Sequence, residues 1–429
     1  MSVSEVSKNQ SAWQKLFDKY RILDGIENSG FFEITSTQIN EFREARLMTK
    51  FDHKINLPDI FDKNRLSILP ISRGGYLISH FEAYKDFEEL NTDIISASFP
   101  EHIESIDYNN ITSEATAINC AYVSGILSDF IEDSEILPTV SGRMSSNTFD
   151  FYIRNQKKNN NILVNVSNSQ IEIDGGFEGI HSLMLLEAKN SLSDDFLVRQ
   201  LYYPYRLWSR SISKPVKPVF MTYSNSIFSL YEYAFQDPNN YNSLVLLKQK
   251  NYSFESTEIT LDDILAVLGR VRMVQEPEVP FPQADSFKRV LNLCELLGEG
   301  EKTRDEIATE YAFDPRQSNY YTDAGRYLGL IDKRREADGV YYFLTDGGKR
   351  LLRLKFKDRQ LKLAELILSH RAFLETFRKT LEYSQLPHRE EIVAIMRESS
   401  LYNVNEYNTY KRRASTIIGW INWILDLSR

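Results

Sequence analysis

The sequence predicts an α/β fold followed by a separate, mainly helical C-terminal region. Between residues 148 and 224, short runs rich in β-branched and aromatic residues alternate with polar turns, and one helical pattern interrupts them. Pro277, Pro280 and Pro282 then fall within eleven residues and predict irregular structure. After residue 285 the apolar periodicity is helical, apart from one hairpin pattern. We therefore expect a linker at 275–284 between the two parts.

Length and composition exclude several classes of protein. A chain of 429 residues, 42% hydrophobic and 26% charged, is expected to form two or three globular domains. No apolar run approaches the roughly 20 residues of a membrane-spanning helix, and residues 1–14 lack the apolar centre of a secretory signal. Cys120 and Cys294 stand far apart, and the six histidines form no HxxxH or HExxH pair. We expect a cytoplasmic protein without disulfides or a cysteine-based zinc site.

Charge is distributed unevenly along the chain. The net charge of −9 by itself argues against a nucleic-acid partner. Residues 285–429, however, hold 25 lysines and arginines against 22 acids, a net charge of +3, whereas the remaining 284 residues carry −12. Such an asymmetry suggests that the two parts have different functions. A local basic surface can bind phosphates even when the whole chain is acidic.

The first 110 residues combine helical and strand-like patterns. Residues 13–23 place apolar side chains at helical spacing and predict an amphipathic helix. Residues 66–71 and 76–79 are strand-like and flank the Gly74-Gly75 turn, which predicts a hairpin.

The middle of the chain predicts strands with helices on both sides. A helix is expected over 113–130 and another over roughly 194–210. The expected strands are 149–153, 162–166, 170–174, 182–187 and 216–222. Strands flanked in this way favour an α/β sandwich.

The C-terminal region predicts three helices and then a β-hairpin. One helical face runs through 287–297, and Thr303 with Glu306 forms a capping box for a second helix. Asp314-Pro315 predicts the start of a third helix. Its apolar face comprises Tyr320 or Tyr321, Ala324, Tyr327 and Leu328. Strand-like runs at 330–335 and 340–344 flank a turn with Asp338-Gly339. This order of elements is that of a winged helix.

A further helical unit is expected from residue 358 to residue 429. Its apolar residues step by four, three, four and three and predict a buried stripe. They are Tyr410, Ala414, Ile417, Ile421 and Ile424. Lys411, Arg412 and Arg413 lie beside this stripe and point largely elsewhere.

Two carboxylates and one lysine are expected to converge at the ends of two strands. Asp174 ends one predicted strand, and Glu187 and Lys189 end the next on a shared face. A hairpin through Gly175-Gly176 would bring Asp174 alongside them. Magnesium prefers carboxylate oxygens and keeps waters in its shell, and a metal-bound water is acidified into a nucleophile. The pattern alone is equally typical of a solvated, charged strand end, but the apolar strand 183–186 favours an internal position.

The order strand–Asp, strand–Glu-x-Lys, helix resembles the PD-(D/E)XK nuclease core. The segments DGGFEG (174–179), LLEAKN (185–190) and RQLYYPYR (199–206) resemble the sequences of a group of prokaryotic type II restriction endonucleases. Residues 43–58, 66–76, 316–331 and 410–425 also resemble this group, so the resemblance covers nearly the whole chain. It implies that Asp174, Glu187 and Lys189 are the metal-binding and catalytic residues, with Ile173 standing where the motif's name has proline.

The resemblance also adds auxiliary residues. Glu114, at the start of the helix before the core, resembles an extra acid that some members place there, and Gln200 matches a helix glutamine near the metal site of some relatives. Glu172 and Glu178 are further acids that are candidates to share the metal.

The resemblance implies an α/β nuclease core with a central mixed sheet flanked by helices over residues 111–274. An α+β region, 1–110, precedes it and is a candidate DNA-contacting region. After the linker, a winged-helix DNA-binding domain is expected over 285–356. A C-terminal helical unit over 357–429 is a candidate second DNA-binding module.

Several residues are candidates to contact DNA. The third C-terminal helix is expected to turn Arg316, Gln317, Asn319 and Arg326 outward, and such side chains read base edges. Lys411, Arg412 and Arg413 are expected to hold phosphates. On the core's second helix, Tyr202, Tyr203 and Tyr205 are expected in the core, whereas Arg206 and Arg210 either contact phosphate or are solvated.

The resulting hypothesis is a Mg²⁺-dependent type II restriction endonuclease that cuts double-stranded DNA at or near a specific sequence. A palindromic site would imply a homodimer, and a restriction system would pair the enzyme functionally with a DNA methyltransferase. Another nuclease of the same superfamily, methyl-directed or for repair, is one alternative. A non-catalytic winged-helix regulator is the other, against which the intact Asp174, Glu187 and Lys189 argue.

Overall fold

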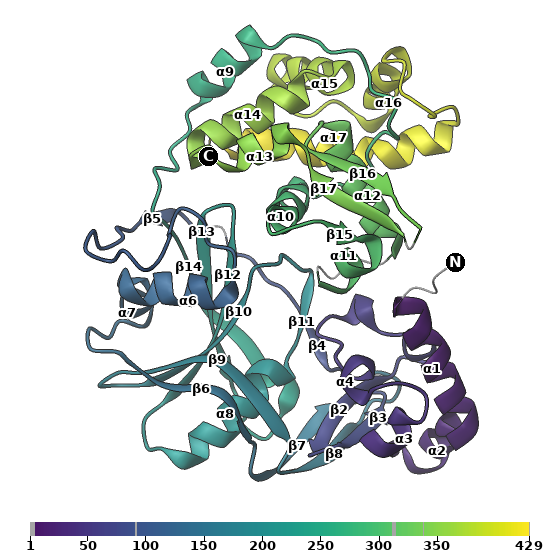
Figure 1. Ribbon diagram of the computed structural model, residues 1–429, viewed down its shortest axis with the longest axis vertical. Helices are drawn as coiled ribbons and strands as arrows, with labels where there is room; N and C mark the ends of the chain where they lie inside the picture. The colour runs from purple at the N-terminus through teal and green to yellow at the C-terminus, as the bar shows by residue number, and fades with distance from the viewer. Residues whose placement is uncertain (1–4, 91, 311–314, 338, 429) are drawn as a thin grey trace. The chain divides into compact units, whose positions relative to one another are not determined.

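The computed structural model describes residues 5–90, 92–310, 315–337 and 339–428 (Figure 1). The chain divides into two compact units. The first comprises residues 1–223 and 227–252, and the second comprises 224–226 and 253–429. In the described part of the chain, no helix is both long and apolar enough to cross a membrane.

The N-terminal part of the first unit packs short helices on a five-stranded sheet. The sheet order is β1-β3-β2-β8-β7, and β2 pairs with β3 in the predicted hairpin. The strands are β1 (Phe31–Thr35), β2 (Ser67–Ser72), β3 (Gly75–Ser79), β7 (Thr148–Arg154) and β8 (Asn161–Ser167). The helices are α1 (Glu5–Tyr20), α2 (Ile22–Ser29), α3 (Ser36–Asn40), α4 (Ala45–Met48), η1 (Lys54–Asn56) and α5 (Asp59–Lys63). Trp13 and Phe17 of α1 are buried against Phe61 in one apolar cluster.

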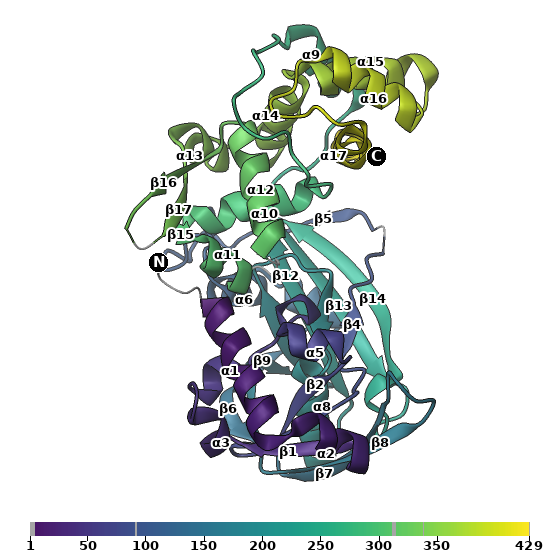
Figure 2. The same ribbon diagram turned by 90° about the vertical axis from the view of Figure 1, so that its right-hand side faces the viewer.

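A seven-stranded mixed sheet forms the rest of the first unit, in the order β5-β14-β13-β12-β10-β9-β6. Figure 2 shows β12, β13 and β14 running side by side. The strands are β5 (Ile94–Ser96), β6 (Leu137–Ser145), β9 (Gln170–Glu178), β10 (Leu183–Lys189), β12 (Val216–Ser224), β13 (Ile227–Phe235) and β14 (Leu244–Ser253). Outside this sheet lie α6 (Glu114–Val123), α7 (Ile126–Ile131), α8 (Arg199–Ser211), η2 (Tyr241–Ser243) and the pair β4 (Tyr84–Asp86) and β11 (Asp195–Leu197). The unit is mixed α/β, as the sequence predicts.

Strand β10 is the internal strand that its apolar sequence predicts. It pairs in parallel with β12 and antiparallel with β9, and residues 183–188 are all buried. Helix α8 packs against β9 and β10 and buries Tyr202 and Tyr203 fully, while Tyr205 is partly buried. These tyrosines are core residues, as expected.

Two arginines of α8 were expected to contact phosphate or to be solvated, and only one of them is buried. Arg206 is only 1% exposed, so the expectation of a phosphate contact or a solvated side chain is wrong. Its Nη1 donates to the Pro238 carbonyl at 2.5 Å and to the Tyr202 hydroxyl at 2.7 Å, and these two acceptors make burial of the charge possible. Arg210 is exposed and donates to the Thr148 carbonyl at 3.3 Å.

Three local predictions in the core are corrected by backbone geometry. The helix expected over 113–130 is two helices, because Gly125 adopts a left-handed conformation with φ 78° between them. The helix expected from 194 begins only at Arg199, after strand β11. Gly175 and Gly176 do not form a turn but lie inside β9. A Cβ on Gly176 would come within 2.6 Å of the Val140 side chain, so this glycine permits close approach of strand β6.

The second unit is mainly helical. Its helices are α9 (Leu261–Arg270), α10 (Phe287–Gly298), α11 (Arg304–Glu310), α12 (Pro315–Tyr327), α13 (Asp346–Leu352), α14 (Phe356–Leu368), α15 (Arg371–Tyr383), α16 (Arg389–Glu398) and α17 (Tyr407–Asp426). Its strands are β15 (Lys302–Thr303), β16 (Ile331–Arg335) and β17 (Val340–Leu344), and β17 lies between the other two. The expected helices, capping box and hairpin are present, with Thr303 and Glu306 bonded reciprocally. Asp314 lies outside the described residues.

The proline-rich segment is irregular but packed within the second unit. Phe281 is 2% exposed and stacks on Phe373 of α15. The Ala284 carbonyl accepts a hydrogen bond from Trp420 Nε1 at 2.7 Å. Phe287 of α10 in turn packs edge-on against Trp420. The expected winged-helix and C-terminal ranges therefore share one core, and the predicted stripe on α17 is buried within it.

Candidate active site

Asp174 and Glu187 face each other across neighbouring strands. Strands β9 and β10 are antiparallel, and their ladder ends with Gly175 opposite Leu186, one residue before Asp174 and Glu187. The backbone N–H of Ala188 donates to Asp174 Oδ2 at 2.9 Å and fixes this carboxylate at the strand end. The two acids thus meet as expected, although through the register of the strands and not through the expected glycine turn.

Glu187 is the best-anchored acid of the group. It is 7% exposed, and its Oε1 accepts from Lys189 Nζ at 2.7 Å and from Gln200 Nε2 at 2.6 Å. Lys189 lies on the same strand face, and Gln200 reaches over from the first turn of α8. Both donors bind one oxygen, which leaves Oε2 for a further ligand.

The electrostatics of the group are unfavourable for its acids. Burial raises the pKa of Glu187 to about 7, and Asp174 adds to the rise while Lys189 opposes it. Burial also works against the charged form of Lys189, but Glu187, Glu114 and Asp174 outweigh it, so the pKa of Lys189 is raised. Negative charge is therefore in excess around one ammonium.

Glu114 joins this cluster from the start of α6. Ser113 caps this helix by accepting from the Thr116 N–H at 3.1 Å, and α6 packs against β10. Burial raises the pKa of Glu114, Lys189 lowers it and Asp174 raises it. We refer to Glu114, Asp174, Glu187 and Lys189 as the acid-rich cluster.

One further acid, Asp52, has no local signal in the sequence. Its carbonyl accepts from the Leu197 N–H at 3.0 Å, and the neighbouring His53 Nδ1 lies 2.7 Å from the Asp195 carbonyl. These contacts hold the segment beside β11, directly before α8. After burial and the nearer charges, Asp52 also contributes to the raised pKa of Glu187 and of Glu114.

The other two acids that were candidates for the metal lie apart from the cluster. Glu172 is exposed and forms an ion pair with Arg143 at 3.3 Å, although it lines the same hollow as Glu187. Glu178 lies at the far end of β9, four residues from Asp174, and pairs with Lys214 at 2.7 Å. At about 3.4 Å per strand residue, Glu178 is too distant to share a ligand with Asp174.

A small, partly open hollow adjoins Glu187 and Gln200. Its remaining lining is mostly apolar, from Ile173, Leu185, Leu186, Leu201 and Pro204, with Glu172 at the edge. Glu187 therefore borders a partly open hollow.

The donor set fits a magnesium ion that keeps part of its water shell. Within the described residues, no three histidine, cysteine, aspartate or glutamate side chains gather closely enough to enclose a metal by themselves. Magnesium, however, is usually bound by one or two carboxylates, with waters and substrate phosphates completing its shell. Asp174 and Glu187 supply two carboxylates, and the raised pKa of buried Glu187 marks negative charge that a cation would relieve.

The residues of α12 that were expected to read bases differ from one another in burial and in hydrogen-bond partners. The side chain of Arg316 lies outside the described residues. Gln317 and Asn319 are partly buried, and Asn319 Oδ1 accepts from the Tyr342 hydroxyl at 3.5 Å. The expectation that Arg326 points outward is wrong, because its Nη1 is paired with Asp323 at 2.8 Å and its side chain is 16% exposed.

The three consecutive cations of α17 also differ from one another. Arg412 is exposed, and Lys411 Nζ lies 3.9 Å from Glu390. Arg413 is partly buried, and its Nε and Nη1 are buried without a hydrogen-bond partner. Burial, and then Arg412, lowers the pKa of Arg413.

Comparisons with known proteins divide the chain into three matched ranges. They match, in order, the models of three domains of unknown function: DUF6996 over residues 10–78, DUF6997 over 79–253 and DUF7226 over 289–429. No curated protein and no solved structure matches the chain. The second range holds the whole acid-rich cluster, whereas Asp52 falls in the first.

Proposed function

We propose that this protein is a Mg²⁺-dependent endonuclease that hydrolyses phosphodiester bonds of double-stranded DNA at or near a specific sequence, as type II restriction endonucleases do. The observation that carries the proposal is the buried Glu187, held between Lys189 and Gln200 and facing Asp174. Buried acids with raised pKa values are unfavourable for folding, and they are often kept for chemistry.

The order of elements supports a PD-(D/E)XK core. Antiparallel β9 and β10 carry the acids, α8 follows and packs on them, and β12 returns parallel to β10. In the second unit, α10, α11 and α12 followed by the β16–β17 hairpin support a winged helix.

The residues have separable roles in the proposed reaction. Asp174 and Glu187 would hold the cation through the oxygens that the recorded hydrogen bonds leave open. Bound there, a divalent cation would supply an acidified water and stabilise charge on the phosphate. Lys189, whose raised pKa keeps it charged, would orient the attacking water or stabilise the developing negative charge. Gln200 fixes the orientation of Glu187.

Sequence recognition is proposed for the second unit. Gln317 and Asn319 are the described candidates for base contacts on α12, and Arg316 remains a candidate from the sequence. Lys411, Arg412 and Arg413 are proposed to contact phosphates. A palindromic target would call for a homodimer, since the symmetry of site and protein go together.

The test is incubation of the full chain with bacteriophage DNA in Mg²⁺, in Ca²⁺ and in EDTA, followed by gel electrophoresis. Discrete fragments in Mg²⁺ alone are expected. A preparation of Glu187→Gln, purified identically, controls for a contaminating nuclease. A smear would indicate a nuclease without sequence specificity, and intact DNA in all conditions would leave the non-catalytic regulator as the better reading.

A further inference from the structure

A dense run of positive charge follows the hairpin of the second unit. Residues 349–357 contain five lysines and arginines and no acid, in a chain whose net charge is −9. Four of the five, Lys349, Arg350, Arg353 and Lys355, are exposed. We refer to these four as the α13 basic face. The fifth, Lys357, pairs with Asp263 at 2.8 Å.

Helix α13 and its C-cap residue Arg353 direct three of these charges to one side, and Lys355 follows at the N-cap of α14. At 100° per residue, Lys349, Arg350 and Arg353 fall within one arc of about 100°. Gly348 and Leu351 lie on the opposite side of the helix and are buried. Figure 2 shows α13 beside the β16–β17 hairpin.

The buried side of α13 is fixed to the backbone before the hairpin. The Thr345 hydroxyl caps the helix by accepting from the Gly348 N–H at 3.0 Å and itself donates to the Gly329 carbonyl at 2.7 Å. A Cβ on Gly348 would come within 2.3 Å of the Leu330 carbonyl oxygen, so the helix lies directly on this backbone. The basic face is therefore presented by a rigid support.

The cations of the α13 basic face differ from other cations of the second unit in their ion pairing. Arg334 is bonded to Glu301 and Glu336, Arg326 pairs with Asp323, and Lys379 pairs with Glu391. Among the described residues, no ion pair is recorded for any of the four cations of the α13 basic face. Four exposed positive charges that form no ion pair with the described part of the chain fit a polyanion.

We propose that the α13 basic face binds the sugar–phosphate backbone of double-stranded DNA, whatever the base sequence. The proposal deepens the proposed function and rests on it for the identity of the polyanion. A membrane surface fits less well, because a helix that lies on a bilayer inserts an apolar face, and the apolar face of α13 is already buried in the unit. Phosphate contacts of this kind give affinity and position the protein, while base contacts elsewhere give specificity.

The test compares two double variants of the full chain that remove equal charge. Arg350→Gln/Arg353→Gln alters the α13 basic face. Arg272→Gln/Arg397→Gln removes two other exposed arginines of the same unit and serves as the matched control. Binding to a duplex of arbitrary sequence is measured by fluorescence anisotropy in EDTA, from 50 to 200 mM salt. Thermal unfolding checks that both variants remain folded.

Each lost phosphate contact should reduce the slope of log K against log salt by about 0.9. For Arg350→Gln/Arg353→Gln we expect a slope shallower by about two, so that wild type loses roughly tenfold more affinity than the variant across this salt range. The control should keep the wild-type slope. Equal slopes for wild type and Arg350→Gln/Arg353→Gln, an equal reduction in both variants, or no binding of DNA by wild type would each overturn the proposal.

A parallel arm measures binding to vesicles of phosphatidylserine and phosphatidylcholine. Loss of vesicle binding in Arg350→Gln/Arg353→Gln, with unchanged DNA binding, would assign the face to a membrane and overturn the proposal. The nuclease assay is interpreted separately. A wild type that binds DNA through this face without cutting it would refute the nuclease and leave the proposal for the α13 basic face intact. A wild type that cuts DNA, with equal salt slopes for wild type and Arg350→Gln/Arg353→Gln, would refute the proposal for the α13 basic face and leave the nuclease intact.

Discussion

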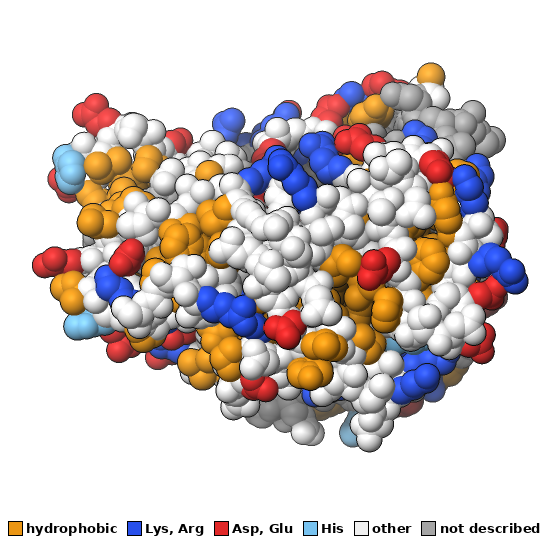
Figure 3. Space-filling view, turned by 90° about the horizontal axis from the view of Figure 1, so that it is seen from below, with side chains coloured by type: hydrophobic (Ala, Val, Ile, Leu, Met, Phe, Trp, Pro, Cys, Tyr) orange, Lys and Arg blue, Asp and Glu red, His pale blue; other side chains and the backbone are white. Residues whose placement is uncertain are grey.

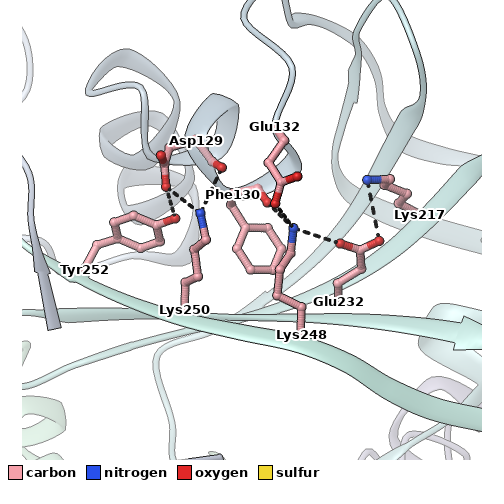
Figure 4. Close-up of polar contacts among 8 residues, drawn as sticks. All are labelled: Asp129, Phe130, Glu132, Lys217, Glu232, Lys248, Lys250 and Tyr252. Carbon is pink, nitrogen blue, oxygen red and sulfur yellow. Dashed lines mark hydrogen bonds and ion pairs between the residues drawn. The ribbon is translucent and has the colours of Figure 1, made fainter. Parts of the chain in front are cut away.

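Two charged clusters lie on the first unit's larger sheet, and they are built on opposite principles. The acid-rich cluster sets Glu114, Asp174 and Glu187 around one lysine of its own, Lys189, while Lys50 outside it also lowers the pKa of Glu114. The second, drawn in Figure 4, joins helix α7 to strands β12, β13 and β14 and balances three acids with three lysines. We refer to it as the balanced cluster, and it consists of Asp129, Glu132, Glu232, Lys217, Lys248 and Lys250. Elsewhere on the surface, as in the face drawn in Figure 3, basic and acidic side chains are interspersed.

In the balanced cluster every lysine has an acidic partner. Glu232 lies 3.6 Å from Lys217 and 3.4 Å from Lys248, which also donates to the Phe130 carbonyl near the end of α7 at 2.6 Å. Lys250 binds Asp129 at 3.0 Å. The Tyr252 hydroxyl and then Lys250 lower the pKa of Asp129. The cluster thus fastens the helix to the sheet and stabilises its acids.

The difference lies in how the acids of each cluster are compensated. Both clusters contain at least three acids, so the number of acids decides nothing. In one, lysines and a tyrosine hold pKa values down; in the other, burial and mutual repulsion hold them up. The acid-rich cluster lacks positive charge that a divalent cation would supply, and the balanced cluster does not.

The largest expected effect is on cleavage. Asp174→Asn, Glu187→Gln and Lys189→Gln should each reduce DNA cleavage by about 10²–10³-fold or more, as loss of one charge-stabilising group does in other enzymes. Binding to a cleavable duplex in Ca²⁺ should persist, because these residues do not read bases. Cleavage is measured from initial rates on a gel, and binding by anisotropy.

Glu172→Gln and Glu178→Gln are the matched controls, since both acids lie near the motif but pair with Arg143 and Lys214. They should cut at rates close to wild type. A nuclease that loses its activity with Glu178→Gln but keeps it with Glu187→Gln would show that the wrong acids have been assigned.

The next expected effect is on the free energy of unfolding, which removal of the Glu187 charge should increase. The pKa of Glu187 in the folded protein, about 7, lies above its value of about 4.3 in an unfolded chain. Ionising it therefore weakens folding, and the loss develops as the pH rises through this interval. Glu187→Gln should stabilise the metal-free protein at pH 8 by about 1–3 kcal/mol and have little effect at pH 4. Urea unfolding in EDTA at both pH values measures this, and destabilisation at pH 8 would refute the excess of negative charge.

The same substitution in the balanced cluster should act in the opposite direction. The Glu232 side chain is 10% exposed and lies between two lysines. Glu232→Gln should destabilise the protein by about 1–2 kcal/mol at pH 8, because Lys217 and Lys248 lose their shared counter-charge. Glu172→Gln, at an exposed ion pair, is the control and should change stability by less than 1 kcal/mol. If Glu232→Gln were neutral, the comparison between the clusters would fail.

The local part of the acid-rich cluster was predictable from the sequence. The strand pattern predicted β9, β10 and the shared face of Glu187 and Lys189, because period-two alternation is a property of the strand itself. Arg326 and Asp323 are three residues apart on a helix, so their ion pair could also have been predicted from the sequence. The turn was misplaced because glycine pairs serve close packing as well as turns, and here Gly176 makes room for Val140.

The long-range parts could not be read in the same way. Asp52 approaches the acid-rich cluster because β11 holds its backbone, and Arg206 is buried because the distant Pro238 carbonyl accepts a hydrogen bond from its guanidinium. In the balanced cluster, Lys248 and Lys250 resemble an exposed strand face in the sequence. Only the packing of α7 on the sheet supplies their partners. Such contacts depend on topology, which a single sequence does not encode locally.

The smallest expected effect separates exposed from buried charge within the balanced cluster. Asp129 pairs with Lys250 and accepts from the Tyr252 hydroxyl at 2.6 Å, but its side chain is 57% exposed. Screening by solvent should therefore limit the loss in Asp129→Asn to below about 1 kcal/mol at pH 7. The folded-state pKa of Asp129 is lowered, so its contribution is present above the unfolded value of about 3.9 and disappears as the pH falls through the lower folded value. Urea unfolding from pH 7 to pH 2.5 should show the two proteins converging at the acid end. A loss at pH 7 as large as that of Glu232→Gln would mean that exposure does not set the strength of these pairs.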